Sequence, residues 1–241
     1  MDSLRVICLP GLGADCRLFQ DVSPLLADPV CPEWIPARGK ETLGEYSVAF
    51  AERVDLSEPF IVFGMSFGGM VALEAAMRQE GFARQCRGIL SVSSCRDKTA
   101  IDNAFKKRAQ LLAYLPDSLL RLGLVTFSER FSPHDSLENR QRMLLRAMAN
   151  ECDLTFFRWA VQACAGWDRL PWDGDQTDVP YWQVHGKNDD VIPIPLGHAD
   201  ETWEDAGHLL NYTHPEQIAQ ALERMAEAVG GRALALDRVS N

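Results

Sequence analysis

The chain has 241 residues, enough for one compact domain with a sizeable core. Its 24 basic and 34 acidic residues give a formal net charge of −10 that no Lys or Arg run offsets, which argues against nucleic acid or anionic membranes as partners. No apolar run approaches the ~20 residues of a membrane-spanning helix, and the first residues lack the features of a secretory signal. The expected location is the cytoplasm.

The seven cysteines show neither a CxxC pair nor the spacing of metal ligands. An odd number of scattered cysteines in a chain of this length is typical of reduced thiols in a reducing compartment. We therefore expect buried small apolar side chains and no metal site.

Short apolar runs alternate along the chain with segments of helical periodicity. We expect strands over residues 5–9, 33–36, 60–63, 88–92, 181–185 and 200–204, and helices over 43–54, 70–79 and 215–229. Strands that are apolar almost throughout and alternate with helices indicate a parallel sheet covered on both faces. The sequence thus predicts an α/β architecture.

This alternation stops after about residue 96, and residues 98–168 have only helical patterns, with several aromatic side chains. An all-helical insertion after a sheet strand is most simply a lid over the strand ends. We expect residues 1–96 and 171–241 to form the core and residues 97–170 to form a helical cap. Residues 230–241 are expected to be a loosely held tail.

The segment Gly64-Met65-Ser66-Phe67-Gly68 has the pattern G-x-S-x-G, between an apolar run and a helix-forming run. This is the context of a nucleophile elbow. Its turn is so tight that the positions two before and two after the serine must lack side chains, and the serine is strained. Ser66 is the predicted nucleophile, with Gly64 and Gly68 as elbow glycines, although a plain strand-to-helix turn uses the same residue types.

A serine hydroxyl needs a base to become an effective nucleophile, and five histidines compete for that role. His214 is at an expected helix start, His185 ends an expected strand, and His134 and His198 are in loop-like segments. His208 lies in a loop between an expected strand and the last helix. Because the chain order for this elbow is serine, acid, histidine, His208 is the predicted general base.

The acid is expected between these two residues in the sequence. Residues 185–193, HGKNDDVIP, follow an expected strand and contain two adjacent carboxylates. Adjacent acids in a loop are usually only solvated, but a glycine-led turn at the carboxyl end of a strand is where this order places the acid. Asp189 is favoured, and Asp190 remains an alternative.

An oxyanion hole requires two backbone N–H groups aimed at the charge that develops on the reacting carbonyl. Phe67 follows the nucleophile and supplies one candidate; Leu12, in the loop Pro10-Gly11-Leu12-Gly13, supplies the other. These glycines do not indicate a nucleotide site, because Cys16 occupies the third glycine position of G-x-G-x-x-G and no P-loop pattern is present.

On these residues the chain resembles the α/β-hydrolase superfamily, and within it the small carboxylesterases and lipase-like hydrolases with a helical cap. The resemblance runs from Val6 to about Val229. It implies an α/β-hydrolase fold and a cofactor-free hydrolase acting on an ester or related acyl bond of a small molecule. In that family the acid stands three residues after the glycine of the strand-end turn, here Asp189, and the histidine follows a glycine, here His208.

Two departures from the family pattern matter. Pro10 stands where the family loop usually has histidine, so that side chain cannot brace the loop, while the backbone donor of Leu12 is retained. The family often begins with a pair of antiparallel strands, for which there is no room before Val6. We therefore expect a reduced, mostly parallel sheet of about six strands.

The resulting hypothesis is a serine carboxylesterase in which Ser66 attacks the acyl carbonyl and His208 accepts its proton. Thioesterase, amidase or lyase chemistry on the same scaffold remains an alternative, as does a non-catalytic ligand-binding module. Haloalkane dehalogenase and epoxide hydrolase chemistry is disfavoured, because those relatives carry Asp at the position of Ser66. The sequence does not indicate the oligomeric state.

Overall fold

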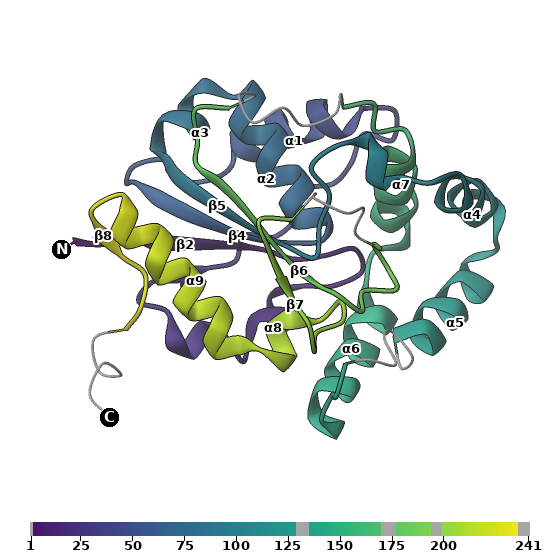
Figure 1. Cartoon of the computed structure of the whole chain (residues 1–241). Coiled ribbons are helices and arrows are strands. Elements are labelled where there is room, and N and C mark those ends of the chain that lie inside the picture. Colours follow the sequence, from purple (N-terminus) through teal and green to yellow (C-terminus); the bar gives the residue numbers. More distant parts are fainter. Residues whose placement is uncertain (1, 129–134, 170–176, 194–198, 236–241) are drawn as a thin grey trace.

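The computed structural model describes residues 2–128, 135–169, 177–193 and 199–235. Within these ranges, one parallel sheet has the strand order β3-β2-β4-β5-β6-β7 (Figure 1). Its strands are β2 (Arg5–Leu9), β3 (Pro29–Val30), β4 (Phe60–Met65), β5 (Cys86–Val92), β6 (Tyr181–Gly186) and β7 (Glu201–Trp203). The predicted α/β architecture, with a mostly parallel sheet of about six strands, is confirmed.

The most apolar strand, β4, lies in the interior of the sheet, between β2 and β5. All six residues of β4 are buried, and β4 pairs with β2 from Arg5 opposite Phe60 to Leu9 opposite Gly64. Its other edge pairs with β5. A strand buried on both faces needs an apolar side chain at almost every position, which the sequence FIVFGM provides.

One predicted strand is wrong. Residues 33–36 are not a strand, and the outer strand β3 lies earlier, at Pro29–Val30. Pro32 and Pro36 bracket the segment and have no N–H to donate to a ladder. The Ile35 carbonyl accepts instead from the hydroxyl of Tyr46, 3.0 Å away, while Trp34 packs on Phe50.

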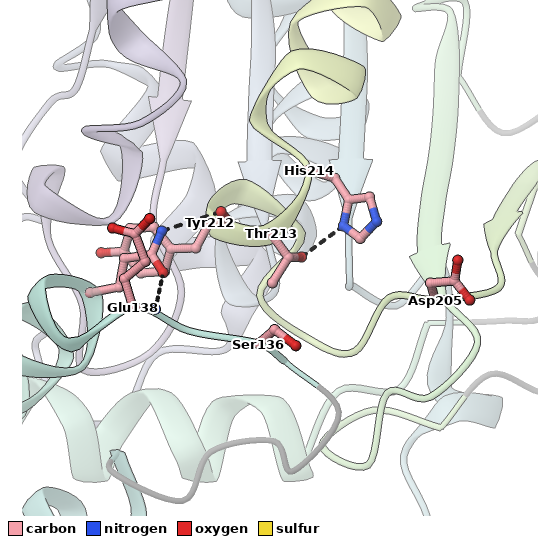
Figure 2. A pocket seen from close by; sticks show the side chains of 7 residues that line it. Ser136, Glu138, Asp205, Tyr212, Thr213 and His214 are labelled. Atoms are coloured by element: carbon pink, nitrogen blue, oxygen red, sulfur yellow. Dashed lines mark hydrogen bonds between the residues drawn. The ribbon is translucent and has the colours of Figure 1, made fainter.

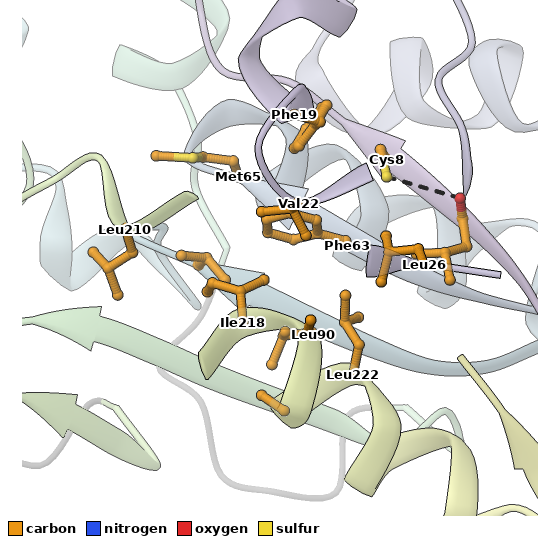
Figure 3. Close-up of a cluster of buried hydrophobic side chains, with 14 of the residues drawn as sticks. Cys8, Phe19, Val22, Leu26, Phe63, Met65, Leu90, Leu210, Ile218 and Leu222 are labelled. Carbon is orange, nitrogen blue, oxygen red and sulfur yellow. Dashed lines mark hydrogen bonds between the residues drawn. The ribbon is translucent and has the colours of Figure 1, made fainter. Parts of the chain in front are cut away.

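Alternate strand residues face opposite layers, because side chains along a strand point to opposite faces in turn. One layer holds α9 (Pro215–Ala228) and the short α8 (Leu210–Thr213). Figure 3 shows side chains from this face, with Phe63, Met65 and Leu90 of the sheet beside Ile218 and Leu222 of α9. The other layer holds α1 (Leu43–Ala51), α2 (Phe67–Arg78) and the adjoining α3 (Glu80–Gln85).

In the described part of the chain between β5 and β6 lie four α-helices: α4 (Asn103–Tyr114), α5 (Asp117–Ser128), α6 (Asn139–Glu151) and α7 (Leu154–Ala165). Figure 1 shows α4, α5 and α6 on the side of the molecule away from β8. Trp159 of α7 fixes this segment to the core, since its indole N–H donates to the Glu41 carbonyl at 3.1 Å. These helices occupy the interval expected for the insertion, and the division into core and cap stays a prediction.

The end of the described chain is held more firmly than expected. A small separate sheet pairs β1 (Asp2–Ser3) with β8 (Gly231–Arg232). Beyond β8, the amides of Ala233 and Leu234 both donate to one carboxylate oxygen of Glu223, at 2.6 and 2.9 Å. The expectation of a loose tail from residue 230 is therefore wrong as far as residue 235, and residues 236–241 lie outside the described ranges.

All seven cysteines are free thiols, of which Cys8, Cys86, Cys95 and Cys164 are buried, Cys31 and Cys152 half-buried and Cys16 exposed. Burial raises the pKa of the Cys86 and Cys164 thiols to about 12. The four buried cysteines therefore behave as the small apolar side chains expected of them. No helix within the described ranges has both the length and the apolar character needed to span a bilayer.

Candidate active site

Ser66 is the single residue between the end of β4 and the start of α2, and its backbone is strained. Its φ is 52° and its ψ is −117°, a conformation that side-chain-bearing residues rarely adopt. Two hydrogen bonds hold it there: Ser66 N–H donates to the Val92 carbonyl at 2.8 Å, and the Ser94 hydroxyl donates to the Ser66 carbonyl at 2.6 Å. The half-buried serine thus has the strained geometry expected of a nucleophile elbow.

The elbow glycines have no space for side chains. A Cβ on Gly64 would stand 2.7 Å from the Cα of Gly69, and a Cβ on Gly68 would overlap the Leu9 carbonyl. The first turn of α2 therefore lies directly on the ends of β2 and β4. The sequence prediction that both positions must lack a side chain agrees with this close approach.

Asp189 and His208 meet beyond the carboxyl ends of β6 and β7. His208 Nδ1 is 2.7 Å from Asp189 Oδ2, and the two residues are only 2% and 4% exposed. The other carboxylate oxygen, Asp189 Oδ1, accepts from the amides of Val191 and Ile192 at 2.8 and 2.9 Å. Asp190, the alternative candidate, is exposed.

Gly186 and the backbone amide of Asn188 bring these loops together. A Cβ on Gly186 would overlap the carbonyl oxygens of Ala206 and Gly207, so the turn after β6 touches the backbone just before His208. The Asn188 amide donates to the Ala206 carbonyl at 3.0 Å and joins the same two loops. Because parallel strands end at one edge, this pair lies at the same edge of the sheet as Ser66.

The surroundings of Asp189 favour its ionised form. Burial is the largest single influence and opposes ionisation, but electrostatic attraction to His208 and His185 and hydrogen bonding with them together outweigh it. The net result is a pKa of the Asp189 carboxyl well below its usual range. A buried carboxylate is therefore available as an acceptor for the His208 ring.

Two side chains at this edge were not anticipated from the sequence. His185 Nε2 lies 2.9 Å from Asp189 Oδ2 and 2.8 Å from the Ile192 carbonyl oxygen. Asp135 Oδ2 accepts from the backbone amides of His208 and Leu209, both at 3.1 Å. The position of His185 directly before the strand-end glycine was a usable signal, whereas Asp135 is 73 residues from His208 and had none.

The two candidate oxyanion donors are near the nucleophile. Phe67 begins α2, where amides have no acceptor within the helix, and Leu12 lies in the loop after β2. A Cβ on Gly11, the neighbour of Leu12, would be 3.3 Å from Ser66 Cβ. Neither the Leu12 nor the Phe67 N–H has an acceptor among the residues that the structure describes, so both remain available to a ligand.

The remaining histidines do not join this group. His214 is the N-cap residue of α9, its Nδ1 is 2.7 Å from the Thr213 hydroxyl, and its ring contacts Trp203. His134 and His198 lie outside the described residues. In the described ranges, no group of three or more His, Cys, Asp or Glu side chains is arranged as a metal site.

A separate polar hollow of about 370 Å³ lies beside α8 (Figure 2). Its lining residues are Ser136, Glu138, Gln141, Asp205, Tyr212, Thr213 and His214. Because Ser66, Asp189 and His208 are not among them, this hollow is distinct from the candidate catalytic group.

Solved structures of known proteins share this architecture. A thermophilic esterase from Thermogutta terrifontis is 18% identical with a TM-score of 0.68, and the match covers 95% of this chain and 91% of that one. A bromoperoxidase from Bacillus anthracis is 14% identical with a TM-score of 0.68, covering 93% and 92%. MenH from S. aureus is 12% identical with a TM-score of 0.71, covering 96% of both chains. At these identities the likeness shows the fold alone.

No curated protein matches the chain. The sequence model of the alpha/beta hydrolase family matches residues 6–221, most of the chain. The protein therefore belongs to the alpha/beta hydrolase family.

Proposed function

We propose that the protein is a serine hydrolase that cleaves a carboxylic ester, or a related acyl bond, of a small molecule through an acyl-enzyme intermediate. The observation that carries the proposal is the buried 2.7 Å hydrogen bond between His208 and Asp189 at the sheet edge that also bears Ser66. A strained serine, an imidazole and a buried carboxylate in this order are the components of nucleophilic acyl transfer.

Asp189 sets the tautomer of the base. An ionised carboxylate has no proton to donate, so His208 Nδ1 must be the donor of their hydrogen bond. In the neutral ring the other nitrogen, Nε2, then carries the lone pair. In the proposed mechanism this lone pair takes the proton of the Ser66 hydroxyl as the serine oxygen attacks the acyl carbon.

The Leu12 and Phe67 amides would stabilise the oxyanion that forms in this step. The imidazolium of His208 then gives its proton to the leaving alcohol as the tetrahedral intermediate collapses. Water attacks the acyl-enzyme with His208 again acting as base, which releases the acid and restores Ser66. No cofactor is needed for either half of the cycle.

The side chains around Phe67 favour an apolar substrate. Ring centroids of Trp34 and Phe156 lie 5.3 and 6.1 Å from that of Phe67, and both side chains keep part of their surface exposed. Leu12 is also half-buried. An apolar acyl or aryl group bound beside the oxyanion donors would cover these surfaces.

Charge, thiols and fold are compatible with this proposal. The net charge of −10 disfavours nucleic acid, and the free thiols fit a reducing compartment such as the cytoplasm. The esterase from Thermogutta terrifontis shares the fold, which is compatible with ester cleavage, whereas the bromoperoxidase shows that the fold serves other reactions.

The test is hydrolysis of a panel of p-nitrophenyl esters of increasing acyl length by the wild type, by Ser66→Ala and by a control. Ser118→Ala removes an exposed hydroxyl from α5 and should leave activity unchanged. Loss of hydrolysis in Ser66→Ala alone supports the proposal, and retained hydrolysis in that variant contradicts it. Fluorophosphonate labelling of Ser66 without ester turnover would instead favour a thioester, amide or lyase substrate, and no labelling would favour a ligand-binding module.

A further inference from the structure

His185 is a buried histidine that the proposed mechanism does not use. It lies near the end of β6, only 1% exposed, four residues before Asp189. Its Nε2 makes a hydrogen bond with the Ile192 carbonyl at 2.8 Å, and Asp189 Oδ2 lies 2.9 Å from the same nitrogen, so one N–H is shared between the two oxygens. These contacts connect His185 directly to the candidate catalytic carboxylate.

The contacts fix the protonation of the ring. A carbonyl oxygen and an ionised carboxylate are both pure acceptors, so His185 Nε2 must carry the hydrogen. The opposite nitrogen, Nδ1, is buried and has no hydrogen-bond partner among the described residues. A second proton there would place an unpaired N–H in the interior, which is costly. His185 is therefore the neutral Nε2–H tautomer.

From this geometry we infer that His185 is a positioning residue for the proposed catalytic group: its Nε2–H holds Asp189 Oδ2 against His208 Nδ1. This inference rests on the proposed function, and it assigns His185 no contact with the substrate. The two oxygens of Asp189 then have separate anchors. The amides of Val191 and Ile192 hold Oδ1, and the two imidazoles share Oδ2.

Sharing one oxygen has an electrostatic consequence. Each hydrogen bond to Oδ2 disperses part of its negative charge, so the His185 contact weakens the attraction between Asp189 and a protonated His208. Without His185, the imidazolium form of His208 would be more stable. Among the described residues, ionisable groups near this pair include Asp135, which accepts from the His208 amide, the buried thiol of Cys95 and the exposed neighbour Asp190.

Three variants separate positioning from space-filling. His185→Gln keeps an N–H donor at about the reach of Nε2, His185→Asn has the same amide on a side chain too short to reach Oδ2, and His185→Leu fills similar volume without a donor. We expect Gln to keep kcat within a few-fold of wild type, whereas Leu and Asn lose about ten- to a hundredfold in kcat with little change in KM. In His185→Leu and His185→Asn, the acid limb of the pH–rate profile should move to higher pH.

The readout that does not depend on turnover is the downfield proton NMR signal of His208 Nδ1–H bonded to Asp189. It should be retained in His185→Gln and displaced or lost in His185→Asn and His185→Leu. Should the Leu variant not fold, the comparison of Gln with Asn decides.

Equal activity and an unmoved acid limb in all three variants would overturn the inference and leave the hydrolase proposal intact. Equal loss in Gln and Asn with an unmoved acid limb would also overturn it, because His185 would then only fill space. If the wild type hydrolyses nothing and takes up no fluorophosphonate, the proposed function fails, and the NMR comparison still decides whether His185 positions Asp189.

Discussion

Asp135 offers a direct test of how the helical segment supports the candidate base. Its buried carboxylate, 2% exposed, accepts through Oδ2 from the amides of His208 and Leu209, each at 3.1 Å. Replacement by Ala leaves two buried amides without this acceptor. At about 1–3 kcal/mol for each unsatisfied group, Asp135→Ala should lower the free energy of unfolding by about 2–6 kcal/mol. Asp135→Asn keeps one oxygen acceptor and should lose about 1 kcal/mol.

Asp135→Ala should also lower activity, because it allows His208 to shift. A displacement of about 1 Å can cost up to about a hundredfold in rate, so we expect kcat for ester hydrolysis to fall about ten- to a hundredfold in Asp135→Ala. The Asn variant should lose only a few-fold. Urea unfolding followed by the fluorescence of the six tryptophans gives the stability, and kcat is measured where each variant is fully folded.

The control is Asp205→Ala, which removes an exposed carboxylate from the same loop and should change neither quantity. An Ala variant with the urea midpoint of the wild type would refute the assigned hydrogen bonds. A destabilised Ala variant with unchanged kcat would refute the link from Asp135 to the placement of His208.

Three further outcomes are expected. Asp189→Asn should reduce kcat by roughly 10⁴-fold while the protein stays folded, because the amide can donate to His208 and favour the wrong tautomer; activity near the wild-type value would contradict this. Asp189 should also make the free energy of unfolding depend on pH in acid. The pKa of its carboxyl in the folded protein lies below the unfolded value of about 3.9. Its contribution to the free energy of unfolding is therefore complete above that pH and is lost as the pH falls toward the folded pKa. Acid unfolding below about pH 4 should accordingly be shallower in Asp189→Asn, and an identical acid limb would count against the shift. Gly68→Ala should abolish folding or strongly lower the melting temperature, because its Cβ would overlap the Leu9 carbonyl. The control, Gly123→Ala in α5, has open space around it and should be neutral or stabilising by about 0.5–1 kcal/mol. Equal melting temperatures of the two variants would refute the close approach at Gly68.

The sequence was most informative where one short segment determines its own structure. The run FIVF followed by G-x-S-x-G predicts both a buried strand and the strained serine after it, and Ser66 has a positive φ at that point. The glycine-led turn after β6, together with the family resemblance, also led to Asp189 as the partner of His208, and the two side chains are in contact. The elbow and the glycine-led turn are each recognisable within about ten residues of sequence, whereas the pairing with His208 was inferred from chain order.

Features that depend on distant partners could not be predicted in this way. Asp135 reaches the His208 loop from another part of the chain, and the residues beyond β8 are held by Glu223 of α9. The missed strand at Pro29–Val30 is two exposed residues whose only signal is the neighbouring strand β2. Such contacts arise from the three-dimensional arrangement and leave no periodic trace in the sequence.

The placement of Asp135 also bears on how this protein can diverge. The candidate catalytic group is built mainly on the sheet and its turns. Close backbone contacts there fix the strained serine, the paired loops after β6 and β7 and the glycines at which these segments touch. Helices α4 and α5 bury only Ala109, Leu120 and Ser128, so most of their positions can change sequence with fewer penalties. Asp135, just before α6, is less free, because it accepts from the backbone amide of His208. Exchange of the helical segment, in nature or by engineering, therefore has to retain an acceptor at this position as well as the contacts of α6 and α7 with the core, such as Trp159 with Glu41.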